Sequence, residues 1–70
     1  MDMIPITSNA IRAVGYDADS RTTRVAFRGG GIYDYLDVGP ELYERMLEPH
    51  PWRRCWRVVK AHEYRRVARA

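Results

Sequence analysis

Residues 24–36 have the sequence RVAFRGGGIYDYL, which predicts a β-hairpin at the centre of the fold. Before the three glycines, Val25 and Phe27 alternate with small or basic residues, which is the two-residue period of a strand with one apolar face. β-branched and aromatic residues dominate both sides of the glycines, as a half-buried sheet prefers. Gly29–Gly31 can supply the positive φ angles that a tight connection between antiparallel strands needs.

A preceding segment extends this hairpin into a three-stranded antiparallel meander. The turn-forming sequence Asp17-Ala18-Asp19-Ser20 joins the first two strands. Strict alternation in the first strand would place Ile11 and Val14 on opposite faces, so the register of this strand stays open. The strands are expected over residues 9–16, 22–28 and 32–38.

Two short helices are expected after the strands. Pro40 suits the first position of a helix, because its missing N–H has no partner there, and Glu41 is favoured at the same end by the helix dipole. This helix ends at Pro49-His50-Pro51. A second helix is expected over residues 52–61, where apolar residues recur with helical spacing and the rest of the surface is basic.

The two ends of the chain carry weaker patterns. Residues 1–8 are expected to be an irregular lead-in, since they contain a proline, although Ile4 and Ile6 could lie against the sheet as a short edge piece. Residues 64–67 could form a last short strand, and residues 68–70 are expected to fray.

The sequence therefore predicts the α+β class. One domain of residues 9–67 contains a three-stranded antiparallel β-meander, with a possible short fourth strand from Tyr64, packed against two short helices. The predicted apolar core is Ile11, Val14, Val25, Phe27, Leu36, Val38, Leu42, Met46, Leu47, Trp56 and Val59.

Length and composition limit the possibilities further. A chain of 70 residues buries only about 60% of its unfolded surface, so its core is thin and dimerisation is a natural way to enlarge it. The single cysteine, Cys55, excludes an internal disulfide and fits a reducing cytoplasm. No apolar run approaches the roughly 20 residues of a membrane span, and the first residues lack the pattern of a secretory signal. We therefore expect a cytoplasmic protein that does not bind a membrane.

Charge is distributed unevenly along the chain. Residues 1–52 contain five basic and eight acidic side chains, a net charge of −3, whereas residues 53–70 contain seven basic side chains and one acid, a net charge of +6. A concentrated cationic segment thus follows a mildly acidic body. All but one of the twelve basic residues are arginine, whose planar fork suits phosphate. Codon bias in a GC-rich genome explains this preference better than selection for phosphate binding, but it does not explain the clustering.

Several of these features together resemble the KTSC domain family. Its most recognisable mark is a central Tyr-x-Tyr, here Tyr33-Asp34-Tyr35, within an ordered set of strand, glycine-rich turn and short helix. The family is named for the C-terminus of some lysyl-tRNA synthetases, and its members include free-standing bacterial and phage proteins of about this length. The resemblance implies no established activity, and it suggests RNA binding through the association with the synthetase. The matching positions are Ile11, Tyr16-Asp17, Val25-x-Phe27, Tyr33-x-Tyr35, Val38-x-Pro40 and the ending Tyr64-Arg65-Arg66-Val67.

The cationic segment is the first candidate site. It can act as a surface that follows phosphates, or it can be a solvated face that keeps a small protein soluble. The candidate nucleic-acid-binding residues in it are Arg53, Arg54, Arg57, Lys60, Arg65 and Arg66, with Arg69 beyond them.

Aromatic side chains are the second candidate. Tyr33 and Tyr35 share one face of a strand, where they could stack on successive bases or pack against the neighbouring strand as part of the core. Trp52 and Trp56 are one helical turn apart and are expected to form one patch, which either covers the sheet or, where a ring is exposed, binds a partner.

The remaining polar residues show no catalytic or metal-binding spacing. His50, His62 and Cys55 match no zinc pattern, and we expect no metal or other cofactor. Asp17 and Asp19 fit a turn. Asp34 is expected on an exposed strand face, and Asp37 near it implies no acid–base pair.

Two hypotheses on function follow. The first is a small non-catalytic module that binds RNA or another nucleic acid through the Arg-rich segment. The second is a bacterial or phage protein-interaction or assembly module that uses Trp52 and Trp56 or a sheet edge, including pairing with a second copy. An enzyme is the least favoured class, because there is no catalytic motif and a short chain leaves little room for a cleft of the usual ~300–1,000 Å³.

Overall fold

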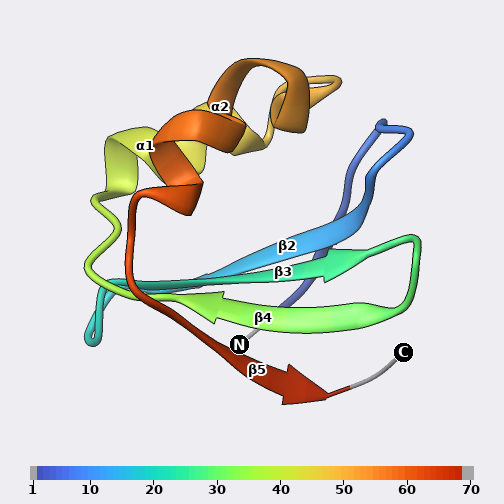
Figure 1. Cartoon of the computed structure of the whole chain (residues 1–70). Coiled ribbons are helices and arrows are strands. Elements are labelled where there is room, and N and C mark those ends of the chain that lie inside the picture. The colour runs from blue at the N-terminus through green and yellow to red at the C-terminus, as the bar shows by residue number, and fades with distance from the viewer. Residues whose placement is uncertain (1, 69–70) are drawn as a thin grey trace.

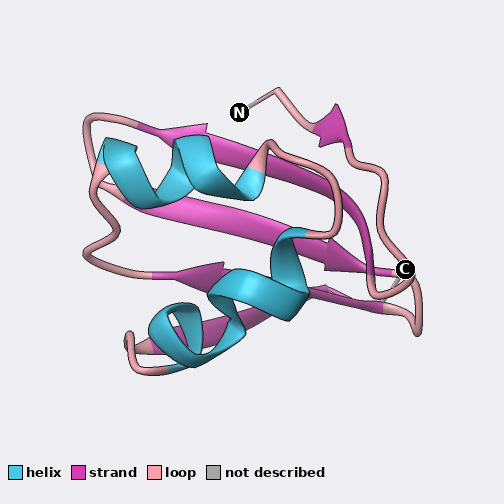
Figure 2. Cartoon of the chain, turned by 90° about the horizontal axis from the view of Figure 1, so that it is seen from above, coloured by secondary structure: helices cyan, strands magenta, loops and turns pink. Residues whose placement is uncertain are grey.

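The computed structural model describes residues 2–68 and has the predicted α+β class. An antiparallel sheet carries both helices on one face (Figures 1 and 2). The strands lie side by side in the order β1-β2-β3-β4-β5, so each strand pairs with its neighbours in sequence. The elements are β1 (Ile4–Pro5), β2 (Ile11–Asp17), β3 (Thr22–Phe27), β4 (Gly31–Tyr35), α1 (Pro40–Met46), α2 (Pro51–Lys60) and β5 (Tyr64–Ala68).

The sheet has five strands rather than the expected three or four. The added strand is β1, which pairs with β2 through Ile4 opposite Val14 and Pro5 opposite Ala13. Pro5 is tolerated because β1 is an edge strand, where a missing N–H costs no sheet hydrogen bond. At the other edge, the expected short fourth strand is confirmed as β5 and reaches Ala68, while residues 69 and 70 lie outside the described residues.

The central hairpin is confirmed, but β4 ends at Tyr35 instead of reaching residue 38, because Asp37 takes a left-handed φ of 55° that a strand does not allow. Thr23 lies opposite Tyr35 and Val25 lies opposite Tyr33, so these side chains share the face that the helices cover. The turn depends on Gly30, whose φ is 103° and whose N–H donates to the carbonyl of Phe27 at 3.1 Å. A positive φ of this kind is readily adopted by glycine.

A β-bulge settles the register of β2. Ile11 lies opposite Phe27, but Ala13 lies opposite Ala26, so the ladder shifts by one residue between them. The extra residue brings Ile11 and Val14 to the same face, and both side chains are fully buried. The strict alternation considered for this strand is therefore wrong.

The core lies between the helices and the sheet, and three predicted members do not belong to it. Leu36 is only partly buried, and Leu47 and Trp56 are exposed by 38% and 40%. Leu47 falls at the end of α1, and α2 turns Cys55 and Val59 inward, which rotates Trp56 by about 100° toward solvent. The buried cluster is Ile6, Ile11, Val14, Val25, Tyr35, Val38, Met46, Cys55 and Val59, with Phe27 and Leu42 packed against it.

The face of the sheet opposite the helices has a buried carboxylate at its centre. Asp34 was expected to be exposed, but its side chain is only 2% exposed. Arg24 on β3 donates to both of its oxygens, at 2.8 and 3.1 Å, and Arg65 on β5 lies 3.6 Å away. One carboxylate thus connects three neighbouring strands.

Removing this carboxylate should destabilise the fold. In Asp34→Ala, two arginines lose their common partner, and we expect the free energy of unfolding to fall by about 2 kcal/mol, less than for a fully buried pair because Arg24 is partly exposed. Glu48→Ala is the matched control, since its pair with Arg54 is exposed and should contribute less than about 0.5 kcal/mol. Urea unfolding measures both changes, and equal losses would contradict this role of Asp34.

Candidate functional site

Five aromatic side chains form a closed circuit of contacts on the helix-covered face. Phe27 contacts Tyr33 and Trp52 with ring centroids 5.9 and 5.0 Å apart. Tyr64 contacts Tyr33 at 5.8 Å and Tyr35 at 5.7 Å, and Tyr35 contacts Trp52 at 6.4 Å. We call these five residues (Phe27, Tyr33, Tyr35, Trp52 and Tyr64) the aromatic circuit.

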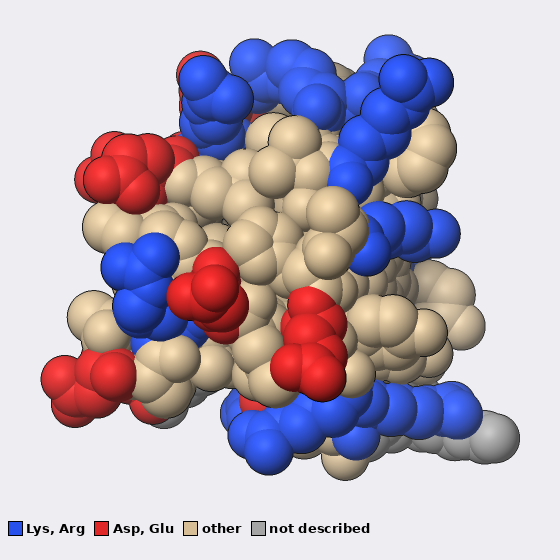
Figure 3. Space-filling model, turned by 60° about the vertical axis from the view of Figure 1, so that its left-hand side comes forward, with Lys and Arg blue, Asp and Glu red and all other residues tan. Residues whose placement is uncertain are grey.

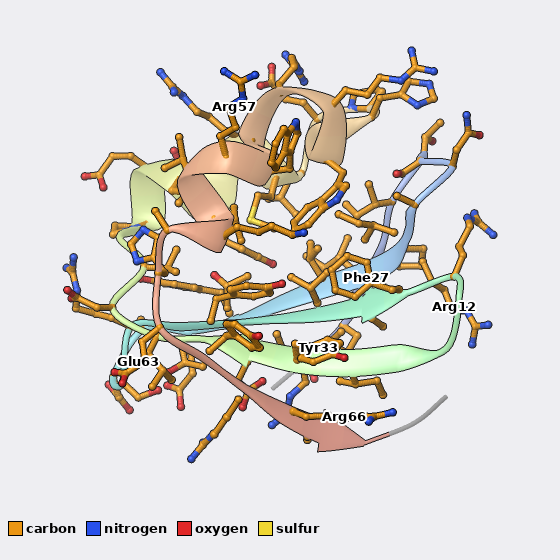
Figure 4. All side chains as sticks on the ribbon, viewed as in Figure 1. Arg12, Phe27, Tyr33, Arg57, Glu63 and Arg66 are labelled. Carbon is orange, nitrogen blue, oxygen red and sulfur yellow. The ribbon has the colours of Figure 1, made fainter. Side chains whose placement is uncertain are left out.

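Four elements supply the aromatic circuit. Phe27 comes from β3 and Tyr33 and Tyr35 from β4, and alternation along each strand directs all three to the same face. Tyr64 lies opposite Tyr35 at the start of β5, and Trp52 descends from the first turn of α2. Figure 4 shows Phe27 and Tyr33 in the space beneath α2.

The aromatic circuit surrounds an open groove of about 380 Å³. In the described part of the chain, its lining consists of the five aromatic residues and Lys60, which is the only charged side chain among them. This volume lies at the lower end of the ~300–1,000 Å³ range of small-ligand sites. The groove therefore reaches the lower limit of that range, which agrees with the expectation that so short a chain leaves little room for a cleft.

The tyrosines of the groove differ in depth. Tyr35 is 5% exposed, Tyr33 is half-buried, and Tyr64 is 60% exposed. Burial raises the pKa of the Tyr35 phenol above its ordinary value, and the neighbouring Tyr33 and Tyr64 raise that pKa further. Among residues 2–68, Tyr16 is the only tyrosine whose hydroxyl has a hydrogen-bond partner, the carbonyl of Val38. The three groove hydroxyls therefore have hydrogen-bonding capacity left for a ligand.

The candidate cations fall into two groups, above and below the groove. In Figure 3, Lys and Arg side chains gather over α2 at the top and again over β5 at the bottom, with uncharged and acidic side chains and a few further basic ones between them. Figure 4 places Arg66 on β5 beside Tyr33, in agreement with their pairing in the sheet, and shows Arg57 on the outer side of α2.

Only some of these cations lack an acidic partner. Within residues 2–68, Arg53, Arg57, Lys60 and Arg66 form no ion pair, whereas Arg54 lies 3.6 Å from Glu48 and Arg65 is bound to Asp34. Arg69 lies outside the described residues.

The two tryptophans do not form one patch, contrary to expectation. Trp52 is half-buried in the aromatic circuit, but Trp56 is 40% exposed. Two cations lie over the Trp56 ring, Arg57 at 5.3 Å and Lys60 at 5.9 Å from its centroid. Trp56 and Lys60 thus join the cationic surface of α2 to the edge of the groove.

Comparison with known proteins identifies the family. The family model for the KTSC domain matches residues 7–51. The chain belongs to the KTSC domain family. A protein of Tsukamurella paurometabola is 33% identical over 66 residues, covering 94% of this chain and 98% of the relative. An uncharacterised protein of Stutzerimonas stutzeri is 32% identical, with 93% of each chain covered.

A solved structure agrees with this assignment. The crystal structure of a KTSC domain protein from Yersinia pestis superposes with a TM-score of 0.87 at 28% identity, and the match covers 96% of this chain and 97% of that one. The match by the family model ends at residue 51, so Trp52, Lys60 and Tyr64 of the groove lie beyond it.

The other polar candidates have structural contacts in this KTSC domain. His50 precedes α2 with a left-handed φ of 54°, and His62 Nδ1 lies 3.0 Å from the carbonyl oxygen of Leu36. Asp17 accepts a hydrogen bond from the N–H of Asp19, as its turn position predicts. In the described part of the chain, no three His, Cys, Asp or Glu side chains gather into a possible metal site, and no helix is long and apolar enough to cross a membrane.

The sequence indicated Tyr33, Tyr35, Trp52 and the cations as candidates, but not their arrangement around one groove. Tyr64 was not expected as a groove residue, because the pairing of β4 with β5 determines which residue faces Tyr35. The available signal was an aromatic residue at the start of a final strand that follows a Tyr-x-Tyr strand.

Replacing Tyr35 with phenylalanine should reduce the loss of stability at alkaline pH. Folded Tyr35 keeps its proton to a higher pH than the unfolded chain does, so the unfolded state binds fewer protons above about pH 10. The free energy of unfolding therefore falls as the pH rises through the pKa of the folded state, and Tyr35→Phe lacks this contribution. Urea unfolding of the wild-type protein and of Tyr35→Phe, at about pH 8 and at about pH 11, measures how much stability each protein loses between the two pH values. The ordinary phenol pKa of about 10 lies between them.

Tyr43→Phe should behave in the same way, because burial also raises the pKa of Tyr43. If the wild-type protein and Tyr35→Phe lose equal stability between the two pH values, the assignment of Tyr35 is wrong.

Proposed function

We propose that this KTSC domain is a small non-catalytic module that binds single-stranded nucleic acid, with RNA as its expected ligand. The observation that carries the proposal is the open aromatic groove between two cationic elements, α2 and β5. Proteins that bind single strands combine a positively charged path for the backbone with aromatic platforms for the bases.

The cations available to phosphates come mainly from α2. Arg53, Arg57 and Lys60 are exposed and form no ion pair within residues 2–68, so phosphate binding would break no contact with a carboxylate. Each phosphate contact releases counterions, which makes the affinity fall as the salt concentration rises. Arg54 and Arg65 support the proposal less, since each already has an acidic neighbour.

The groove favours single strands over duplexes. Its lining combines aromatic faces with polar atoms, which include Lys60 and the tyrosine hydroxyls, so it suits a base, with its flat face and polar edge, better than a phosphate. Bases in a duplex are already stacked on one another, whereas unpaired bases can stack on protein side chains.

Charge reversal on α2 tests the proposal. In Arg53→Glu/Arg57→Glu, binding to a short single-stranded RNA should weaken about tenfold or more, and the slope of log K against log salt should flatten by about 1.4, which is ~0.7 for each lost phosphate contact. Fluorescence anisotropy with labelled RNA at several salt concentrations measures both quantities. A short DNA strand and an RNA duplex, titrated in parallel, show whether the preference is for RNA and for single strands.

The matched control is Arg12→Glu/Arg45→Glu. It makes the same change in net charge at two exposed arginines that lie on β2 and α1 and form no ion pair within residues 2–68. This control should keep most of the affinity. Absence of binding by the wild-type protein at low salt, or an equal loss in the two double variants, would overturn the proposal.

Exposed Trp56 supports a second candidate function, a protein-interaction or assembly module. Tryptophan and arginine are enriched among the residues that dominate protein interfaces, and Trp56 is exposed beside Arg57. The edge strand β5 favours assembly less, because Arg65 and Arg66 put charge on that edge. Light scattering over a range of protein concentrations tests self-association. A dimer that Trp56→Ala dissociates would support this function, and a strict monomer at every concentration would count against self-assembly.

A further inference from the structure

We infer that the groove is a slot for one unpaired nucleobase, with the adjoining phosphate on Lys60 and Arg66. The inference rests on the proposed function and specifies which part of the strand each residue binds. The ligand class is one nucleoside monophosphate unit, either free or within a single strand.

The dimensions of the groove favour one base rather than a run of stacked bases. Its volume of about 380 Å³ is small for a ligand site, and the aromatic circuit closes on itself instead of forming a row along the sheet. Tyr35 lies at the buried end and Tyr64 at the exposed rim. A flat ring that enters past Tyr64 would therefore contact aromatic side chains from both α2 and the sheet.

The tyrosine hydroxyls can recognise the polar edge of a base. The hydroxyls of Tyr33, Tyr35 and Tyr64 have no hydrogen-bond partner among the described residues. The Tyr64 ring lies 5.8 Å from the Tyr33 ring and 5.7 Å from the Tyr35 ring, so the three phenols lie close together. All three are protonated at neutral pH, because the ordinary pKa of a phenol is about 10. A phenol both donates and accepts, and base edges offer both kinds of partner.

Charge decides between the two ligand classes that an aromatic site can bind. Aromatic cages bind quaternary ammonium groups through cation–π interactions. Among residues 2–68, Lys60 is the only charged lining residue and no carboxylate lines the groove, while Arg66 pairs with Tyr33 in the sheet beside it. A cationic ligand would be repelled, whereas a planar base attached to a phosphate satisfies both the aromatic lining and the cations.

Strands without bases provide the direct test. A single-stranded oligouridine or oligoadenosine should bind about tenfold or more tightly than a strand of the same phosphate count made only of abasic sites, since base–aromatic stacking is the difference between them. The slope of log K against log salt should be the same for both strands, because the phosphate contacts are unchanged.

Tyr64→Thr removes the ring at the rim. Tyr64 is 60% exposed, and threonine, like tyrosine, is a residue that strands prefer, so the fold should be retained and circular dichroism checks it. We expect this variant to reduce the affinity for the base-containing strand about fivefold or more and to leave the affinity for the abasic strand unchanged. The matched control is Val67→Thr, which changes an exposed side chain of the same strand outside the groove lining and should leave the ratio of the two affinities unchanged.

Three other results would contradict the inference. Equal binding of both strands, together with no effect of Tyr64→Thr, overturns the slot and leaves the proposed function standing. Absence of binding by either strand at low salt overturns the proposed function and the slot with it. Binding of a trimethyl-lysine peptide that depends on Tyr64, measured by the same titration, assigns the groove to a cation and also overturns the inference.

Discussion

Two short helices have to cover one face of a five-stranded sheet, and much of the structure follows from this constraint. Met46 of α1 and Cys55 and Val59 of α2 pack on the centre of the sheet, where Val14 and Val25 are fully buried. Aliphatic side chains do not extend this core to the edge strand β5. Large aromatic rings occupy that region instead, and rings that meet edge to face leave the groove between them.

The buried carboxylate on the opposite face complements this arrangement. Asp34 connects Arg24 of β3 to Arg65 of β5, and so it holds the edge strand in register. Tyr64, the neighbour of Arg65, then faces the aromatic circuit because adjacent residues of a strand point to opposite sides. A polar contact on one face of the sheet thus positions a groove residue on the other.

The basic residues of the cationic segment fall into two groups, those with an acidic partner and those without one, which composition alone does not distinguish. Arg54 and Arg65 neutralise carboxylates of the body, while Arg57 and Lys60 lie over Trp56 and remain without acidic partners within residues 2–68.

The groove combines residues that lie inside the match to the KTSC family model with residues that lie beyond it. Phe27, Tyr33 and Tyr35 lie within it, and Trp52, Lys60 and Tyr64 follow it.

Local patterns in the sequence determined the α+β class, the β3–β4 hairpin, the position of Pro40 at the start of α1 and the shared face of Tyr33 and Tyr35. These features depend on alternation, glycine turns and helix starts, which act within a few residues. Tertiary structure alone decided the bulge that unites Ile11 with Val14, the burial of Asp34, the outward rotation of Trp56 and the closure of five rings around one groove. Each of these depends on which distant residues become neighbours when strands pair and helices dock, and no local period contains that information.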